Sequence, residues 1–170
     1  MSAQKLEKLD ARYSARLRVA EDPGLLRLIA AFLAHSGDSW FCLLGLGLLL
    51  WLGTPYWQMR AFTMIAGIII TAILVMLIKF TVRRQRPKGE WGSIYRNTDP
   101  HSFPSGHSAR TWMLTTLAVG LGPFWLAALF FVWSLLVGWA RVSMGVHYLT
   151  DVLAGWFLGV VMGLFFLWLF

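Results

Sequence analysis

Cysteine and acidic residues are scarce in this sequence of 170 residues. The single cysteine, Cys42, lies within an apolar run, so no disulfide can form within the chain. Only 8 residues are Asp or Glu, against 15 Lys or Arg, and the acidic residues are scattered. A magnesium or two-metal site needs several carboxylates close together, so we expect neither a metal ion nor another cofactor.

Long polar stretches are also few, because 58% of the residues are hydrophobic and the mean hydropathy is +0.62. The first 24 residues have no apolar core, so they do not resemble a cleavable signal peptide. Several later runs approach about 20 residues, the length that crosses about 30 Å of hydrocarbon. We therefore expect an all-α, polytopic membrane bundle in a plasma membrane of bacterial type. Because the basic residues flank apolar runs, anionic lipid is favoured over nucleic acid as a partner.

Five apolar segments are the expected spans. They are Ser39–Leu52, Tyr56–Phe80, Ser105–Leu121, Pro123–Ala140 and Tyr148–Phe170. Residues 4–22 have apolar side chains on one face between basic ones, which predicts an amphipathic helix on the membrane surface. Leu25–Ala34 is too short to span and is expected at the interface; if it crosses, there are six spans. Gly159 and Gly163 form a GxxxG pattern, which indicates close packing within the chain or a homodimer.

Polar residues gather in three segments at the ends of these spans. The segments are residues 79–87, 104–107 and 140–151. Ionisable residues beside membrane spans are costly, so they indicate function. Because successive spans alternate in direction, all three segments fall on the same side of the membrane. We therefore expect them to meet at one face of the bundle.

A phosphate pocket is expected where these segments meet. Lys79, Arg86 and Arg141 would repel one another without an anion between them, and Asp99 and Asp151 are among the few acidic residues nearby. Backbone N–H groups and the helix dipole favour phosphate at a helix start, and Ser105 and Gly106 begin the third span. Arginine adds bidentate donors for a tetrahedral oxyanion.

Two histidines would make this pocket a catalyst. His147 and Asp151 are four residues apart, so they share a face if a helix begins there. The carboxylate would fix the imidazole tautomer and leave the other nitrogen to attack phosphorus. His107, on a different helix, can protonate the leaving oxygen.

The three segments resemble the signature of the type 2 phosphatidic acid phosphatase (PAP2) superfamily, which includes the vanadium haloperoxidases. The family pattern is Lys-x6-Arg-Pro, then Pro-Ser-Gly-His, then Ser-Arg-x5-His-x3-Asp. The matching residues are Lys79, Arg86 and Pro87, then Pro104, Ser105, Gly106 and His107, then Arg141, His147 and Asp151. Ala140 stands where the family has serine before the arginine. The resemblance covers about residues 79–155.

The resemblance implies metal-independent hydrolysis of a lipid phosphate or diphosphate. It would proceed through a phosphohistidine at His147, with Asp151 orienting that residue and His107 acting as the acid. The implied phosphate ligands are Lys79, Arg86, Ser105, Gly106 and Arg141, and vanadate would occupy the same pocket. Residues 36–170 would form the PAP2-type phosphatase domain, preceded by an interfacial segment, residues 1–35.

The substrate and the acceptor are left open by the sequence. Candidate substrates are polyprenyl phosphates and diphosphates, phosphatidylglycerol phosphate, phosphatidic acid and polyprenyl-linked sugar phosphates. A lipid phosphotransferase would use the same residues. A non-enzymatic binder or transporter of anionic lipids would keep the cations but would not need the two histidines.

Polar residues outside the motifs are expected to have structural roles. Arg84 and its basic neighbours are expected to anchor the chain at the interface, and His35 and Asp38 to form a turn. Arg110 either contacts a distal phosphate or extends to the interface.

The distribution of charge predicts the side of the membrane. With five spans, 14 of the 15 Lys and Arg residues fall on the same side as the site, and only Arg60 lies opposite. Eleven remain when the three expected phosphate ligands are set aside. The positive-inside rule then predicts an active site on the cytoplasmic face.

Overall fold

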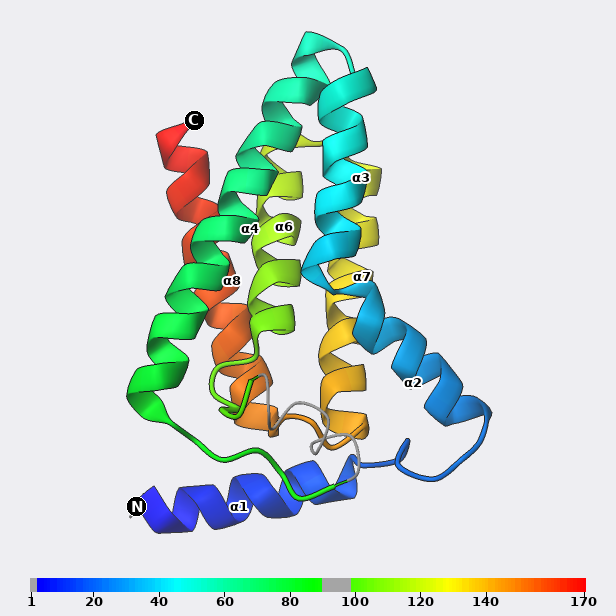
Figure 1. The fold of residues 1–170 in the computed structure, drawn as a ribbon, viewed down its shortest axis with the longest axis vertical. Coiled ribbons are helices and arrows are strands. Elements are labelled where there is room, and N and C mark those ends of the chain that lie inside the picture. The colour runs from blue at the N-terminus through cyan, green and yellow to red at the C-terminus, as the bar shows by residue number, and fades with distance from the viewer. Residues whose placement is uncertain (1–2, 90–98) are drawn as a thin grey trace.

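The computed structural model describes residues 3–89 and 99–170, and every regular element within them is a helix (Figure 1). The helices are α1 (Ala3–Arg16), α2 (Leu25–Ser36), α3 (Ser39–Leu52), α4 (Pro55–Val82), α6 (Gly106–Leu121), α7 (Phe124–Ser143) and α8 (Leu149–Leu169). Each expected span corresponds to one helix, with ends that differ by a few residues. The all-α bundle is therefore confirmed.

Helix length limits how many segments can cross a membrane alone. α4, α7 and α8 are long and apolar enough, and α2 with α3 passes the same test as one span bent by 53°. α6 has 16 residues, which is about 24 Å at about 1.5 Å per residue and shorter than the hydrocarbon core. By length and composition, the described helices give three spans, or four with the bent pair. The counts of five and six spans stay predictions.

α6 lies in the middle of the bundle and packs against α8, α7 and α4 (Figure 1). Glycines of α8 allow its backbone to approach α6 closely. A Cβ atom at Gly159 would lie 2.8 Å from the Met113 nitrogen, and one at Gly163 would lie 3.1 Å from the Met113 carbonyl oxygen. The GxxxG pattern therefore serves packing within the chain, and the homodimer stays a prediction.

Substituting Gly155 with alanine should destabilise the bundle, because the new methyl group would meet the backbone at Ser105. We expect a loss of about 1–3 kcal/mol, or several degrees in Tm, measured by thermal unfolding in detergent. Gly45→Ala is the matched control, because a Cβ atom there has nothing within 4 Å. Equal Tm values for the two variants would contradict this packing.

The polar segments lie together at one end of the bundle, where α1 crosses it (Figure 1). The C-terminus and the α3–α4 turn lie at the other end. α1 is joined to the start of α8, because Ser14 Oγ accepts the Leu149 N–H at 2.8 Å and Asp10 Oδ1 accepts the Thr150 N–H at 3.2 Å. The surface helix thus supplies side-chain caps for amides in the first turn of α8.

Candidate active site

The chain that leaves α4 is paired with the chain that enters α6. Gln85 and His101 form an isolated antiparallel bridge, and the Ser102 N–H donates to the Arg84 carbonyl at 2.8 Å. Two stretches from either side of residues 90–98 are therefore fixed side by side. This pairing places the cations of the first motif beside the Pro-Ser-Gly-His motif.

The start of α6 is fixed by its own cap and by α8. Ser105 is the N-cap, and its Oγ accepts hydrogen bonds from the N–H and the hydroxyl of Ser108 at 3.4 and 2.9 Å. The Ser105 N–H donates to the Asp151 carbonyl at 2.9 Å. The helix start, where amides lack partners within the helix and favour anions, is thereby joined to the third motif.

The third motif folds as a tight connection between α7 and α8. The N–H groups of Val146 and His147 both donate to the Arg141 carbonyl at 3.2 Å. Asp151 Oδ2 accepts the Tyr148 N–H at 2.9 Å and so caps α8. His147 is 1% exposed and Asp151 is fully buried.

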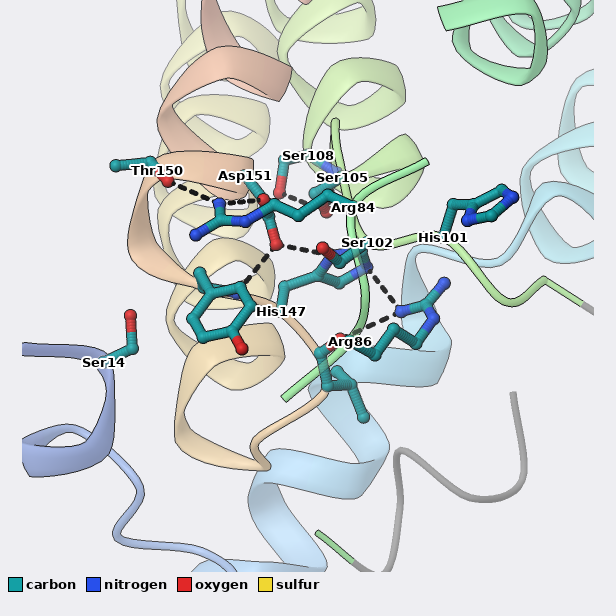
Figure 2. Close-up of polar contacts among 12 residues, drawn as sticks. Ser14, Arg84, Arg86, His101, Ser102, Ser105, Ser108, His147, Thr150 and Asp151 are labelled. Carbon is teal, nitrogen blue, oxygen red and sulfur yellow. Dashed lines mark hydrogen bonds and ion pairs between the residues drawn. The ribbon is translucent and has the colours of Figure 1, made fainter. Parts of the chain in front are cut away.

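The two ring nitrogens of His147 face different partners (Figure 2). Nε2 lies 3.2 Å from Arg86 Nη1, and Nδ1 faces Asp151 Oδ2 at 3.6 Å. Because a guanidinium group only donates, Nε2 must carry a lone pair and Nδ1 the hydrogen. The distance from Nδ1 to Asp151 is longer than a hydrogen bond, so the carboxylate acts on the imidazole through its negative charge.

Asp99 holds the two cations of the first motif. Its Oδ2 lies 2.5 Å from Lys79 Nζ and 2.8 Å from Arg86 Nη2, and its carbonyl accepts from Arg86 Nε at 2.8 Å. Lys79 and Arg86 are buried, whereas the Asp99 side chain is 31% exposed. The carboxylate therefore stands where a phosphate oxygen could bond to the same donors.

A cavity of about 250 Å³ lies between α4, α6, α7 and the start of α3. Five predicted site residues line it: Lys79, Gly106, His107, Arg141 and His147. The other three, Arg86, Ser105 and Asp151, are buried around it. A larger groove, about 990 Å³, lies beside α1 and contains none of the predicted site residues. The eight residues chosen from the sequence are thus brought together at one cavity.

Arg84 differs from its predicted role as an interfacial anchor. Its Nη1 donates to Asp151 Oδ1 at 2.6 Å, its Nη2 donates to Asp10 Oδ2 at 2.6 Å, and its guanidinium lies 4.1 Å from the Tyr148 ring centroid. Figure 2 shows the Arg84 guanidinium in contact with Asp151, whose other oxygen faces His147. Arg84 therefore holds the carboxylate that faces the histidine.

Asp38 also differs from its predicted place in a simple turn. Its Oδ2 does contact His35 Nδ1 at 3.1 Å, but its Oδ1 lies 2.5 Å from His107 Nε2. The signal that could have identified it is an acidic residue isolated between two apolar segments. Arg110, which also lines the cavity, donates to the Gly37 carbonyl.

His147 should stay neutral at mildly acidic pH. Burial, followed by the positive charges of Arg86, Arg141 and Lys79, lowers its pKa well below the ordinary value of about 6.5. The imidazole should therefore keep its Nε2 lone pair when the pH falls from about 7.5 to 5.5. NMR of the histidine ring protons, with His147→Gln for assignment, would measure this. Titration of the His147 signal near pH 6.5 would contradict it.

The sequence and fold have clear relatives. The family model of the PAP2 superfamily matches residues 60–170. The chain is 34% identical over 104 residues to an undecaprenyl-diphosphatase of Sulfolobus acidocaldarius, covering 57% of this chain and 48% of that protein. It is 32% identical over 148 residues to a decaprenylphosphoryl-5-phosphoribose phosphatase of Mycobacterium tuberculosis, covering 85% of this chain and 80% of that protein. It thus spans about half the length of the Sulfolobus relative.

The fold resembles the crystal structure of a transmembrane PAP2-type phosphatidylglycerolphosphate phosphatase from Bacillus subtilis. The TM-score is 0.76 at 24% identity, and the match covers 95% of this chain and 84% of that chain. At this identity the likeness concerns the fold alone. The family match, in contrast, extends over all three motifs and most of the chain. The chain belongs to the PAP2 superfamily.

Proposed function

We propose that this protein hydrolyses a lipid phosphate or diphosphate without a metal ion, through a phosphohistidine at His147. The arrangement of His147 supports the proposal best, because Nε2 is turned to the cations and Nδ1 to Asp151. Membership of the PAP2 superfamily supports the reaction class. The adjoining cavity is large enough for a phosphate group.

In the first step, a phosphate group displaces the Asp99 carboxylate and bonds to Lys79, Arg86 and Arg141. The His147 Nε2 lone pair attacks phosphorus while the bond from phosphorus to the lipid oxygen breaks. His107 gives its proton to that departing oxygen. The Ser105 hydroxyl, the Gly106 amide and the three cations stabilise the negative charge on the transferred group.

In the second step, water replaces the lipid. His107, now neutral, takes a proton from the water molecule as its oxygen attacks phosphorus. The phosphorus–nitrogen bond breaks, and its electrons return to His147 as the Nε2 lone pair. Inorganic phosphate leaves, and the site regains its first protonation state. Asp151 stabilises His147 through both steps, and Arg84 holds Asp151 in place.

Polyprenyl-linked phosphates are the first candidate substrates. Two relatives, at 34% and 32% identity, are named for undecaprenyl and decaprenylphosphoryl substrates. Phosphatidylglycerol phosphate and phosphatidic acid also present a phosphate group at the membrane surface. In each case the phosphate would enter the cavity and the chains would stay between the helices.

Phosphate release by purified protein in detergent tests the proposal. The panel contains polyprenyl diphosphate, polyprenyl monophosphate, phosphatidylglycerol phosphate and phosphatidic acid, each with excess chelator. His147→Ala protein, purified in the same way, controls for contaminating phosphatases. We expect release from at least one lipid, unchanged by the chelator and absent in the variant.

Other outcomes would contradict the proposal in different ways. Loss of activity with the chelator would contradict the metal-independent route. Transfer of labelled phosphate to a second lipid, without free phosphate, would identify a phosphotransferase. Binding of a lipid without release or transfer of its phosphate would indicate a non-enzymatic binder or transporter.

We propose that the active site faces the cytoplasm of a cell with a bacterial-type plasma membrane. Basic residues concentrate on α1 and around the motifs, at the end of the bundle that carries the site. Arg60 lies on α4, one turn from the opposite end. The excess of cations at the site end favours the cytoplasm under the positive-inside rule.

Cysteine labelling in intact cells tests this orientation. In a Cys42→Ser background, Asp22→Cys would mark the end with the site and Thr54→Cys the other end, and both positions are exposed. An impermeant thiol reagent should label only position 54 before permeabilisation. Labelling only at position 22 would place the site on the outer face.

A further inference from the structure

The junction between α2 and α3 is part of the wall of the active site. Asp38 directly precedes α3, and its Oδ1 lies 2.5 Å from Nε2 of His107. Gly37 packs against the same histidine, since a Cβ atom there would lie 3.4 Å from His107 Cδ2. Ser39, the first residue of α3, lines the cavity. A segment outside the three motifs therefore reaches the residue assigned as the acid.

We propose that Asp38 is the positioning residue of the acid–base histidine, His107. This inference rests on the proposed function, because it assigns Asp38 a task in the same reaction. With Nε2–H directed to the carboxylate, only Nδ1 of His107 is left to give or take a proton at the substrate. Asp38 would thus fix which nitrogen serves the reaction and how the ring is turned.

Charge gives Asp38 a second effect on His107. The titratable groups around the carboxylate are His35 on α2, Cys42 on α3, and His107 and Arg110 on α6, and Arg141 on α7 acts on His107. The protonated form of His107 would face the cations of Arg110 and Arg141. The Asp38 carboxylate is the charge beside the ring that favours this protonated form. Without it, the acid needed for the first step would be less populated.

The junction is anchored so that Asp38 stays in place. Arg110 donates to the carbonyl of Gly37, one residue before Asp38, from the same helix that carries His107. Trp133 Nε1 donates to Ser36 Oγ at 2.9 Å and joins the end of α2 to α7. The second oxygen of Asp38 contacts His35 Nδ1 at 3.1 Å. Three contacts therefore fix the carboxylate against the histidine.

Each of the two catalytic histidines would then have a supporting carboxylate from a different part of the chain. Asp151 faces Nδ1 of His147 and leaves Nε2 to attack phosphorus. Asp38 binds Nε2 of His107 and leaves Nδ1 to serve the departing oxygen and, later, the water molecule. Each carboxylate selects one nitrogen of its ring. This division predicts that loss of Asp38 affects proton transfer and spares phosphate binding.

Substrates that differ in their leaving group separate this role from a structural one. The rate constant kcat/KM reports the steps through departure of the leaving group. A long-chain alkyl phosphate needs a proton on its leaving oxygen, whereas a nitrophenyl phosphate releases nitrophenolate, which is a stable anion without a proton. For Asp38→Asn we expect kcat/KM to fall about 10²-fold with the alkyl phosphate and at most about 5-fold with the nitrophenyl phosphate.

Three further measurements test the same role of Asp38. Inorganic phosphate should inhibit wild type and Asp38→Asn at similar concentrations, because the cations are unchanged. The basic limb of the pH profile should move to lower pH in Asp38→Asn, because the protonated form of His107 loses its carboxylate. Adding Asp38→Asn to His107→Ala should cause little further loss. Asp22→Asn, an exposed loop residue, is the matched control.

Each outcome has a separate meaning. If wild type releases phosphate from neither compound, the proposed function fails. If wild type is active and Asp38→Asn loses the same factor on both compounds, or loses nothing, the role of Asp38 is overturned. If Asp38→Asn does not fold, Asp38→Glu is measured in its place. A loss of kcat/KM on the alkyl phosphate alone supports the proposal. No loss, or the same loss on both compounds, contradicts it.

Discussion

Replacing His147 with alanine should lower kcat for the lipid phosphate by at least about 10⁴-fold, because no other group can form the covalent intermediate. His147 is 1% exposed and its Nε2 is the imidazole nitrogen turned to Arg86. The measurement is phosphate release under single-turnover conditions, where a slow release of product cannot hide the chemical step. Removal of the side chain should leave the cations in place.

Binding of inorganic phosphate distinguishes a lower kcat in His147→Ala from unfolding of the variant. Lys79, Arg86 and Arg141 remain in the variant, so protection by inorganic phosphate against thermal unfolding should persist. A fall in kcat of less than about 10-fold would assign the nucleophile to another residue. Loss of both binding and cooperative unfolding would show that the variant has not folded, and His147→Gln would then replace it.

Replacing Arg86 with lysine should lower kcat/KM by about 10²- to 10³-fold, although the charge is kept. The guanidinium bonds at once to the Val146 carbonyl at 2.9 Å, to Asp99 at 2.8 Å and to His147 Nε2 at 3.2 Å. An ammonium group is a single point and cannot reproduce this fork. The lysine side chain would also be too short to contact both the histidine and a phosphate oxygen.

Arg83→Lys is the matched control for that substitution. Arg83 lies three residues earlier, is exposed and donates to the Phe80 carbonyl at 2.8 Å. Its change to lysine should alter kcat/KM by less than about 2-fold. If Arg86→Lys were as active as Arg83→Lys, the hydrogen-bonding geometry at Arg86 would not matter. Its positive charge alone would then explain its contribution to kcat/KM.

The helices and the three motifs could be predicted because local sequence determines them. Gly122 and Pro123 separate two apolar runs, and α6 ends and α7 begins around them. The alternating direction of the spans brings the motifs to one end, as Figure 1 shows. Asp151 lies in the first turn of α8, whereas His147 precedes this helix, and the two side chains still face each other at 3.6 Å.

The groups that support Asp151 and His107 could not be predicted, because they depend on contacts between distant segments. Arg84 pairs with Asp151, 67 residues away, and with Asp10, 74 residues away. His107 pairs with Asp38, 69 residues away. No sequence spacing indicates such pairs. An isolated acidic residue beside apolar helices is the one local signal, and it does not name its partner.

A covalent phosphate at His147 is the central intermediate of the proposed reaction, and trapping it is the most direct test. Labelled lipid phosphate would be mixed with the protein, quenched in alkali within milliseconds and digested for mass spectrometry. We expect a phosphoryl group on the imidazole of His147, stable in alkali and lost in acid. His107→Ala, given a nitrophenyl phosphate, should accumulate it, because the water-activating base is missing. Phosphate on another residue, or turnover with no phosphoenzyme in either protein, would contradict the central claim.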